Sequence, residues 1–238
     1  MPSKNQQVIC EQLEDCCLHY KLDDPKSLPK SQQLLVERDG RHAVLNVIEV
    51  SLEAGYPFTV QSISEFKQLR KLKVTGVDPI AKGCDPIFGF LELEELVFTR
   101  TSLNDLSGFL ALKKLQKFGF YDLTTGTQGA EVFGELNFLT ALHLNDHPVD
   151  QLQLDGIAKS ETITDLSFTV NVNQLDLSPL SKMNQLVQIK IKRLEAVELD
   201  LSVLLGLKSL KYLDIGTPRE SDSPVLLELE RRGIHNGV

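Results

Sequence analysis

Apolar residues recur along the chain in one pattern, at offsets 0, 3, 6 and 8 from the first of them. The clearest copy is LKKLQKFGF at 112–120, whose last two apolar positions alternate, as in a short strand that buries one face. Eight copies follow one another at spacings of 22 to 24 residues. Their first positions are residues 42, 66, 90, 112, 136, 160, 183 and 207. Such regular spacing predicts a solenoid in which each repeat packs against the next.

The LxxLxxLxL pattern at this period resembles that of leucine-rich repeat proteins, and the repeat length is nearest to the internalin-like class. The resemblance covers about residues 42–217. It implies an α/β fold: a right-handed, horseshoe-shaped solenoid whose concave face is a parallel sheet of about eight short strands. The family usually places an asparagine in a turn five residues after the third apolar position. Only Asn171 matches here, so an irregular member is expected.

Three segments between the strands share an L-x-L-[SD]-x-[LI] pattern, at 152–157, 175–180 and 199–204. Their alternating apolar residues predict a short extended stretch that is buried on the convex side. The Pro, Gly and Ser that follow favour a turn over a long helix.

Both ends of the solenoid are expected to carry caps, because an end repeat otherwise exposes its apolar core. For the N-terminal cap, residues 1–41, we predict a helix over 5–20 and a strand over 33–38, with Asp39-Gly40 turning into a hairpin that covers the first repeat. Residues 218–238 are the predicted C-terminal cap, with a helix that starts at Ser223-Pro224 and ends at Gly233. The caps and the repeats at 42–217 are expected to form a single domain.

Leucine makes up 41 of the 238 residues, as a ladder of repeats requires. The net charge of −8 argues against general binding to nucleic acids or anionic membranes. Residues 122–181 hold nine acids and one base, so their net charge of −8 equals that of the whole chain. Residues 182–219 hold seven bases and four acids, a net charge of +3. This polarity suggests a protein partner that carries a basic patch.

The sequence offers no apolar stretch long enough to cross a membrane, and its N-terminus has acidic residues early, so a cytoplasmic protein is expected. The four cysteines, Cys10, Cys16, Cys17 and Cys84, do not show zinc-ligand spacing. We expect reduced thiols, no metal and no cofactor.

In each strand, the residues between and beside the last two apolar positions are expected to face the concave surface. The function predicted from this arrangement is a non-catalytic protein–protein interaction module. The candidate partner-binding residues are Glu95, Lys117, Tyr121, Asp122, His143, Asn145, Asp146, Asp165, Ser167, Thr169, Lys190, Lys192, Arg193 and Tyr212.

Two alternatives remain open at this level. One is an immunity-type or inhibitor-type protein that occludes a basic partner. The other is an enzyme, because Tyr121, His143 and Asp165 fall on neighbouring strands and could act as acid–base groups. The sequence lacks the common catalytic motifs, and an open strand face excludes water poorly, so a non-enzyme is predicted.

Overall fold

The fold is taken from a computed structural model of the chain. It describes residues 20–22, 34–38, 41–45, 47–53, 69–75, 87–100, 106–121, 130–148, 150–170, 175–193, 199–216 and 223–236. The predicted helix at 5–20, apart from its last residue, and all four cysteines lie outside these ranges.

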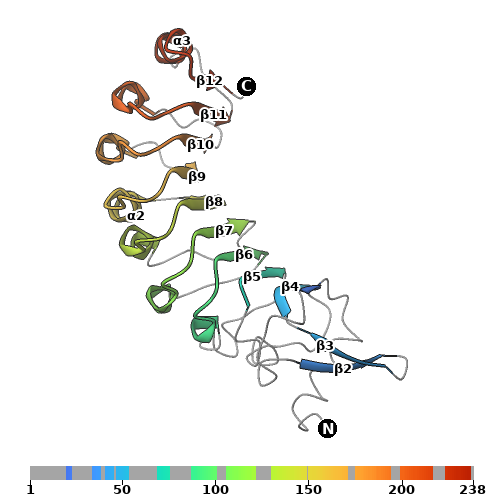
Figure 1. The fold of residues 1–238 in the computed structure, drawn as a ribbon. Helices are drawn as coiled ribbons and strands as arrows, with labels where there is room; N and C mark the ends of the chain where they lie inside the picture. Colours follow the sequence, from blue (N-terminus) through green and yellow to red (C-terminus); the bar gives the residue numbers. More distant parts are fainter. Residues whose placement is uncertain are drawn as a thin grey trace.

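Eight parallel strands form one curved sheet, and each pairs with its neighbours in sequence order. In Figure 1 they line the inner side of an arc, as the repeat pattern predicted. The strands are β4 (Val47–Glu53), β5 (Lys71–Thr75), β6 (Glu95–Thr99), β7 (Lys117–Tyr121), β8 (Ala141–Pro148), β9 (Asp165–Val170), β10 (Gln188–Arg193) and β11 (Tyr212–Gly216). Two short strands that the sequence analysis did not predict extend the sheet to ten: β1 (Tyr20–Leu22), antiparallel to β4, and β12 (His235–Asn236), parallel to β11.

The register follows the repeat at the paired apolar positions of β5–β11, shifts after Leu144 of β8, and differs from the prediction at β4. Leu72, Leu96 and the equivalent residues of later strands lie side by side, as the pattern requires. At β4, however, Val50 lies opposite Leu72 and Leu52 lies opposite Val74. The first copy therefore starts two residues later than the predicted position 42. A two-residue shift preserves the alternation of apolar positions along a strand, so the apolar pattern alone did not distinguish the two registers.

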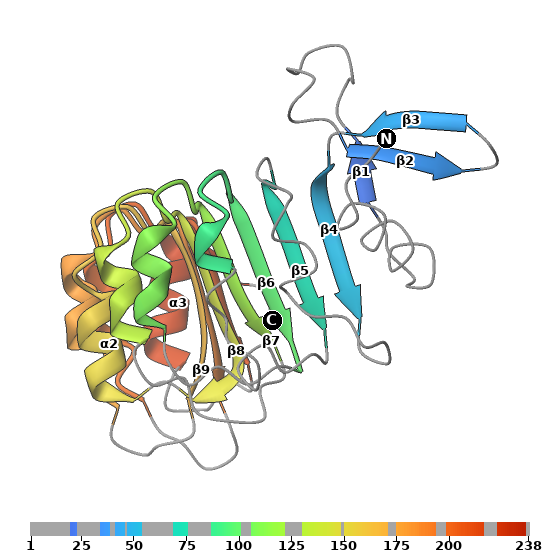
Figure 2. The same ribbon diagram turned by 90° about the horizontal axis from the view of Figure 1, so that it is seen from below.

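The N-terminal hairpin is confirmed, but it does not cover the first repeat. Strands β2 (Leu34–Arg38) and β3 (Arg41–Leu45) pair antiparallel as a separate two-stranded sheet, visible beside the main sheet in Figure 2. The edge of β4 is instead covered by β1, which contains the end of the predicted helix, Tyr20. Pairing with β1 satisfies backbone groups that an open edge would leave exposed.

The convex side is built from short helical turns, as seen on one side of the sheet in Figure 2. Within the described residues, no helix is long and apolar enough to cross a membrane. The turns are the 3₁₀ helices η4 (Ile87–Gly89), η5 (Ser107–Ala111), η6 (Ala130–Glu135), η7 (Ser178–Lys182) and η8 (Ser202–Gly206), together with the α-helix α2 (Gln151–Ile157).

Helix α2 corrects the prediction of an extended stretch at 152–157. Asp150 and Gln153 form a capping box: the Gln153 backbone N–H donates to Asp150 Oδ1 at 2.8 Å, and the Asp150 N–H donates to Gln153 Oε1 at 3.1 Å. These two bonds satisfy amides that the first turn of a helix leaves free, so the helix begins here.

The other two return segments also differ from the prediction of an extended stretch: residues 178–180 and 202–204 lie in η7 and η8, and Leu177 and Leu201 just before them have helical φ and ψ angles. Asp176 and Asp200 accept hydrogen bonds from the backbone amides of Ser178 and Ser202, at 2.8 and 2.9 Å. Hydrogen bonds from these serines hold the pKa of both carboxyls below its ordinary value. The shared Leu-Asp-Leu-Ser sequence thus starts both helical turns in the same way.

Successive repeats are joined at the start of each strand by a shared carbonyl. The Gln116 carbonyl accepts from the backbone N–H groups of Thr140 at 2.8 Å and Ala141 at 3.0 Å, and from the Thr140 hydroxyl at 3.1 Å. The carbonyls of five further residues each accept two amides of the next repeat. They are Arg70, Glu94, Thr140, Thr164 and Val187. These bonds fix the spacing between coils independently of the side chains.

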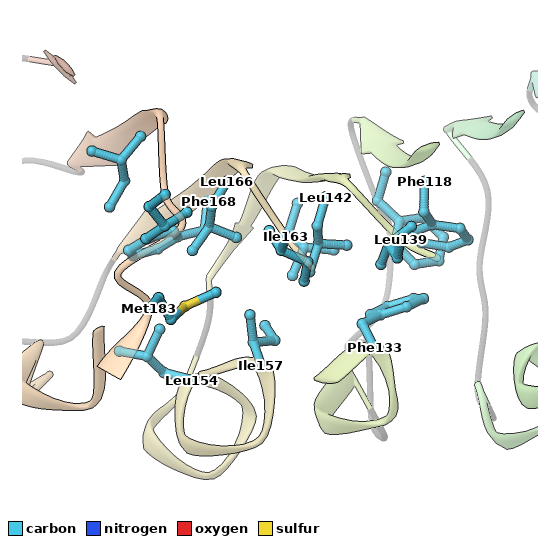
Figure 3. Close-up of a cluster of buried hydrophobic side chains, with 14 of the residues drawn as sticks. Phe118, Phe133, Leu139, Leu142, Leu154, Ile157, Ile163, Leu166, Phe168 and Met183 are labelled. Atoms are coloured by element: carbon cyan, nitrogen blue, oxygen red, sulfur yellow. The ribbon is translucent and has the colours of Figure 1, made fainter. Parts of the chain in front are cut away.

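The core changes character along the solenoid. Its N-terminal part is aromatic: Phe118 packs on Phe133 and Phe120 with ring centroids 4.3 and 4.7 Å apart, and also contacts Phe98 and Phe109. Towards the C-terminus, leucine, isoleucine and methionine fill the same layer, and Figure 3 shows the transition between the two parts. One continuous core thus runs through the described repeats, with no break that would divide them.

The C-terminal cap closes the last repeat. Helix α3 (Ser223–Arg231) buries Leu226 and Leu229, and Ile234 follows after Gly233, which has a positive φ of 80° and ends the helix as predicted. Arg232 fixes the cap by donating to the carbonyl of Leu205 at 2.6 Å.

Replacement of Phe118 tests whether the described repeats unfold together. Phe118→Ala leaves a cavity in the aromatic layer and should lower the free energy of unfolding by about 3–5 kcal/mol. The control Phe138→Ala removes a side chain that is 61% exposed and should change it by about 0.5 kcal/mol or less. Urea unfolding, followed by circular dichroism, measures both. A Phe118→Ala protein as stable as the control would contradict the single core.

Candidate functional site

Three positions of each of the strands β5–β11 face the concave side, one before, one between and one after the two buried positions. Of the fourteen residues predicted from the sequence, Asp122 and the side chains of Asp146 and Arg193 lie outside the described part. The other eleven take these concave positions. Ser167 and Thr169 among them are only 4% and 1% exposed, so they form the floor of the face and do not project from it.

Tyr121, His143 and Asp165 are in contact, as their neighbouring strands suggested. His143 lies on β8 between the other two. Its Nδ1 is 3.1 Å from the Tyr121 hydroxyl, and its Nε2 is 3.1 Å from Asp165 Oδ2. The network continues through Asn145, which is hydrogen-bonded to Tyr121, to the Ser167 hydroxyl, which donates to Asn145 Oδ1. These five residues, hereafter the central network, join three adjacent strands.

With a neutral His143, one direction of hydrogen bonding satisfies all contacts of the central network. Ser167 donates to the Asn145 oxygen, so the Asn145 amide nitrogen donates to the Tyr121 oxygen. Tyr121 then donates to Nδ1 of His143, and Nε2–H donates to the Asp165 carboxylate. The tautomer of neutral His143 that completes this chain carries its proton on Nε2. The second oxygen of Asp165, Oδ1, is buried with no hydrogen-bond partner among the described residues.

The position of Tyr121 depends on Gly119, a residue that the sequence analysis placed on the concave face without assigning it a role. A Cβ atom on Gly119 would come within 2.8 Å of the Tyr121 ring. Gly119 also lies directly opposite His143 in the β7–β8 register. The missing side chain therefore leaves the space through which the Tyr121 ring reaches the histidine. The signal in the sequence is a glycine two residues before an aromatic residue in a strand.

The electrostatics of the central network keep Tyr121 in its neutral form. Burial raises the pKa of the Tyr121 hydroxyl, and the negative charges of Asp165 and Glu95 raise it further, against a smaller opposing effect of the Asn145 hydrogen bond. The phenol therefore stays protonated at neutral pH, and it meets His143 as a neutral hydroxyl.

The acidic residues of the stretch 122–181 do not gather on the concave face. Seven acids of the stretch 122–181 have described side chains, and only Asp165 lies on the concave face. The other six lie on the convex turns or the connecting loops: Glu131, Glu135, Asp150, Asp155, Glu161 and Asp176. The described concave positions of β5–β11 instead carry more bases than acids. They are Lys71, Lys73, Lys117, Lys190 and Lys192 against Glu95, Asp165 and Asp214.

Tyr212 is the large aromatic residue at the C-terminal end of this face. It is 50% exposed, and its ring stacks on His235 of β12 with centroids 5.6 Å apart. The stacking restrains the orientation of the tyrosine ring, and it depends on β12, a strand that the sequence analysis did not predict.

Other features of the described residues offer less to a ligand. They contain no group of three His, Cys, Asp or Glu side chains that could hold a metal ion. A shallow hollow of about 510 Å³ lies beside the loops at 134–137 and 159–162. Two of its polar groups already serve the backbone: Ser160 accepts from the amide of Ile163 at 3.1 Å, and Thr162 donates to the carbonyl of Leu139 at 2.8 Å.

No family model matches the chain, and no curated protein matches its sequence. Among solved structures, an internalin (inlF) from Listeria monocytogenes is similar over 78% of this chain, with a TM-score of 0.54 and 18% identity. The chain has the leucine-rich repeat fold. Internalin C2 from the same organism gives a TM-score of 0.50 at 19% identity, over 78% of this chain and 81% of its own. A plant ice-binding protein gives 0.51 at 16% identity, over 90% of this chain and 71% of its own.

At these identities the likeness concerns the fold alone. The leucine-rich repeat chain spans 59% of the inlF internalin chain, less than two thirds of it.

Alkaline titration tests the environment of Tyr121. Because its pKa is raised in the folded protein, the folded state holds this proton at a pH where the unfolded chain releases it, near 10. Stability should therefore fall as the pH rises above about 10, and Tyr121→Phe should remove that part of the fall. Ultraviolet absorbance of tyrosinate measures the titration, with Tyr212→Phe as the control. If Tyr121→Phe instead removes a tyrosine that ionises at or below the ordinary pH of about 10, the raised pKa of Tyr121 is contradicted.

Gly119→Ala tests the geometry of the central network. The added methyl group should turn the Tyr121 ring away from His143 and remove the hydrogen bond to Nδ1. The ¹⁵N shift of His143 Nδ1 in NMR spectra should then match that of Tyr121→Phe. Gly89→Ala adds a methyl group where no atom lies within 4 Å, and it should leave the His143 signals unchanged. Unchanged signals in Gly119→Ala would show that the tyrosine does not depend on the glycine.

Proposed function

We propose that this chain is a non-catalytic protein-binding module that receives its partner on the concave strand face. The observation that carries the proposal is the exposure of charged and aromatic side chains on that face of an otherwise apolar sheet. Lys73, Lys117 and Lys190 are exposed, and Tyr212 is half exposed. Eight strands at a spacing of about 4.8 Å span roughly 34 Å, which matches one side of an ordinary protein–protein interface.

The rigidity of the face supports the same function. Each strand is held by its two neighbours and by the shared carbonyls at its start. The central network restrains Tyr121 and His143 from one strand to the next. Side chains that are ordered before binding lose less conformational entropy on binding, so a given contact contributes more to affinity.

The two alternatives have less support. In a catalytic triad a histidine is likewise held between a carboxylate and a hydroxyl, but here the hydroxyl is a phenol whose pKa is raised, so its ionised form is harder to reach than that of a free tyrosine. An inhibitor that occludes a basic partner would need acids on the concave face. Asp165 is the one acid of the described part of 122–181 that lies there, and it is hydrogen-bonded to His143.

Site-specific photocrosslinking tests the face and does not require the partner to be identified first. A benzophenone amino acid replaces Tyr212 on β11 or, as the control, Leu152 on α2, which is 68% exposed on the convex side. In an extract of the native source, the probe at position 212 should form a discrete crosslinked product that the probe at 152 does not form.

A charge reversal then ties the product to the face. Lys117→Glu on β7 should reduce the yield of crosslinking from position 212, whereas Lys182→Glu on the convex turn η7 should not. Crosslinking from position 152 alone, or an equal loss in both variants, would place the interface elsewhere.

A further inference from the structure

The net charge of the described concave positions is opposite in sign to the net charge of the whole chain. The chain carries a net charge of −8, yet the described concave positions of β5–β11 hold five lysines and three acids. Salt at physiological strength screens charges beyond about 8 Å, so a partner close to this face responds to the local lysines more than to the distant acids.

All three concave acids are already engaged by neighbours on the same face. Glu95 pairs with Lys71 at 3.6 Å, and Asp165 contacts His143 at 3.1 Å. Asp214 forms an ion pair with Lys190 across β10 and β11. The charges of Glu95 and Asp214 are balanced within their lysine pairs, whereas Asp165 beside a neutral His143 keeps its negative charge at the central network.

Lys73 and Lys117 remain, and neither makes an ion pair with another described residue. Both are exposed, with Lys73 on β5 and Lys117 on β7. Glu95 lies opposite Lys117 in the register, but its carboxylate reaches Lys71 instead. Two lysines without acidic partners on a rigid sheet are suited to bind carboxylates from outside.

The face beside these two lysines is low up to the central network. Lys73 lies opposite Val97, and Ala141, which lies opposite Lys117, is buried. The space over Gly119 is taken by the Tyr121 ring, so the low part ends there. A segment of extended chain could therefore approach the sheet beside Val97 and Ala141, where it would reach both lysines.

The separation of Lys73 and Lys117 matches the repeat of an extended peptide. The two residues lie two strands apart and two residues out of register, which corresponds to roughly 12 Å between their Cα atoms. Acidic residues at positions i and i+4 of an extended segment are about 13 Å apart, at 3.3 Å per residue. Towards the C-terminal end of the face, β10 carries two further lysines, Lys192 and Lys190, and Lys190 is paired with Asp214.

We propose that the concave face binds an acidic, extended segment of a partner protein, whose carboxylates pair with Lys73 and Lys117. This inference rests on the proposed function and adds the chemical class of the partner. A long nucleic acid is less suitable, because its phosphates would extend past the lysines to the acidic rest of a chain of charge −8.

The test uses a short fluorescein-labelled peptide of alternating glutamate and glycine, the same peptide with lysine for glutamate, and a single-stranded RNA of equal length. Fluorescence anisotropy of the full chain at low ionic strength should show binding of the glutamate peptide alone. The variant Lys73→Glu/Lys117→Glu should weaken this binding by about tenfold or more, which corresponds to about 1.4 kcal/mol. The control Lys113→Glu/Lys182→Glu reaches the same net charge with changes in the turn after η5 and on η7, and it should weaken binding about twofold at most.

Each other outcome overturns the inference. Equal weakening in the two double variants would mean a response to net charge alone. Tighter binding of the lysine peptide would mean that the partner segment is basic. Tighter binding of the RNA would mean that the partner is a nucleic acid. Urea unfolding of both variants confirms that they are folded.

Photocrosslinking separates this inference from the proposed function. If position 212 still crosslinks a partner while the glutamate peptide does not bind, the concave face is an interface and only the acidic class is wrong. If position 212 forms no product either, both proposals fail.

Discussion

No single repeat of this chain can bury its own apolar residues, and this constraint determines the rest of the structure. Each coil contributes one strand and one short turn, so its leucines and phenylalanines are covered only when another coil lies on either side. The shared carbonyls at the strand starts set the distance at which the coils meet. At the two edges of the described parallel strands, β1 pairs with β4, and β12, which follows α3, pairs with β11.

The same constraint divides the residues of each strand into two sets. Alternate residues such as Leu142 and Leu144 must be apolar, because they enter the core. His143, between them, is free of that demand, and so are its equivalents on other strands. The residues of the concave face therefore do not have to be apolar, and an acidic protein can carry a lysine-rich face without loss of its core.

The repeat made most of the fold predictable. A period of 22–24 residues gave the eight strands, and it placed three members of the central network on adjacent strands. The pattern failed at 152–157, because Leu154 and Ile157, three residues apart, also fit the buried face of a short helix that leaves Leu152 exposed. Strands β1 and β12 have two or three residues, too few for a periodicity, and they form only because a sheet edge is open beside them.

The sequence analysis summed the charge of residues 122–181 and expected an acidic recognition surface. In a solenoid, however, the residues of such a stretch are spread over all sides of the molecule. A segment of this length passes through the concave face, a loop, the convex turns and a second loop several times. Its net charge therefore averages over surfaces that point in opposite directions and that no single partner contacts. The relevant quantity is the charge summed over equivalent positions of successive repeats, and for the described concave positions that sum has the opposite sign to the chain. Register, not segment composition, thus links the sequence of this protein to what its concave face attracts.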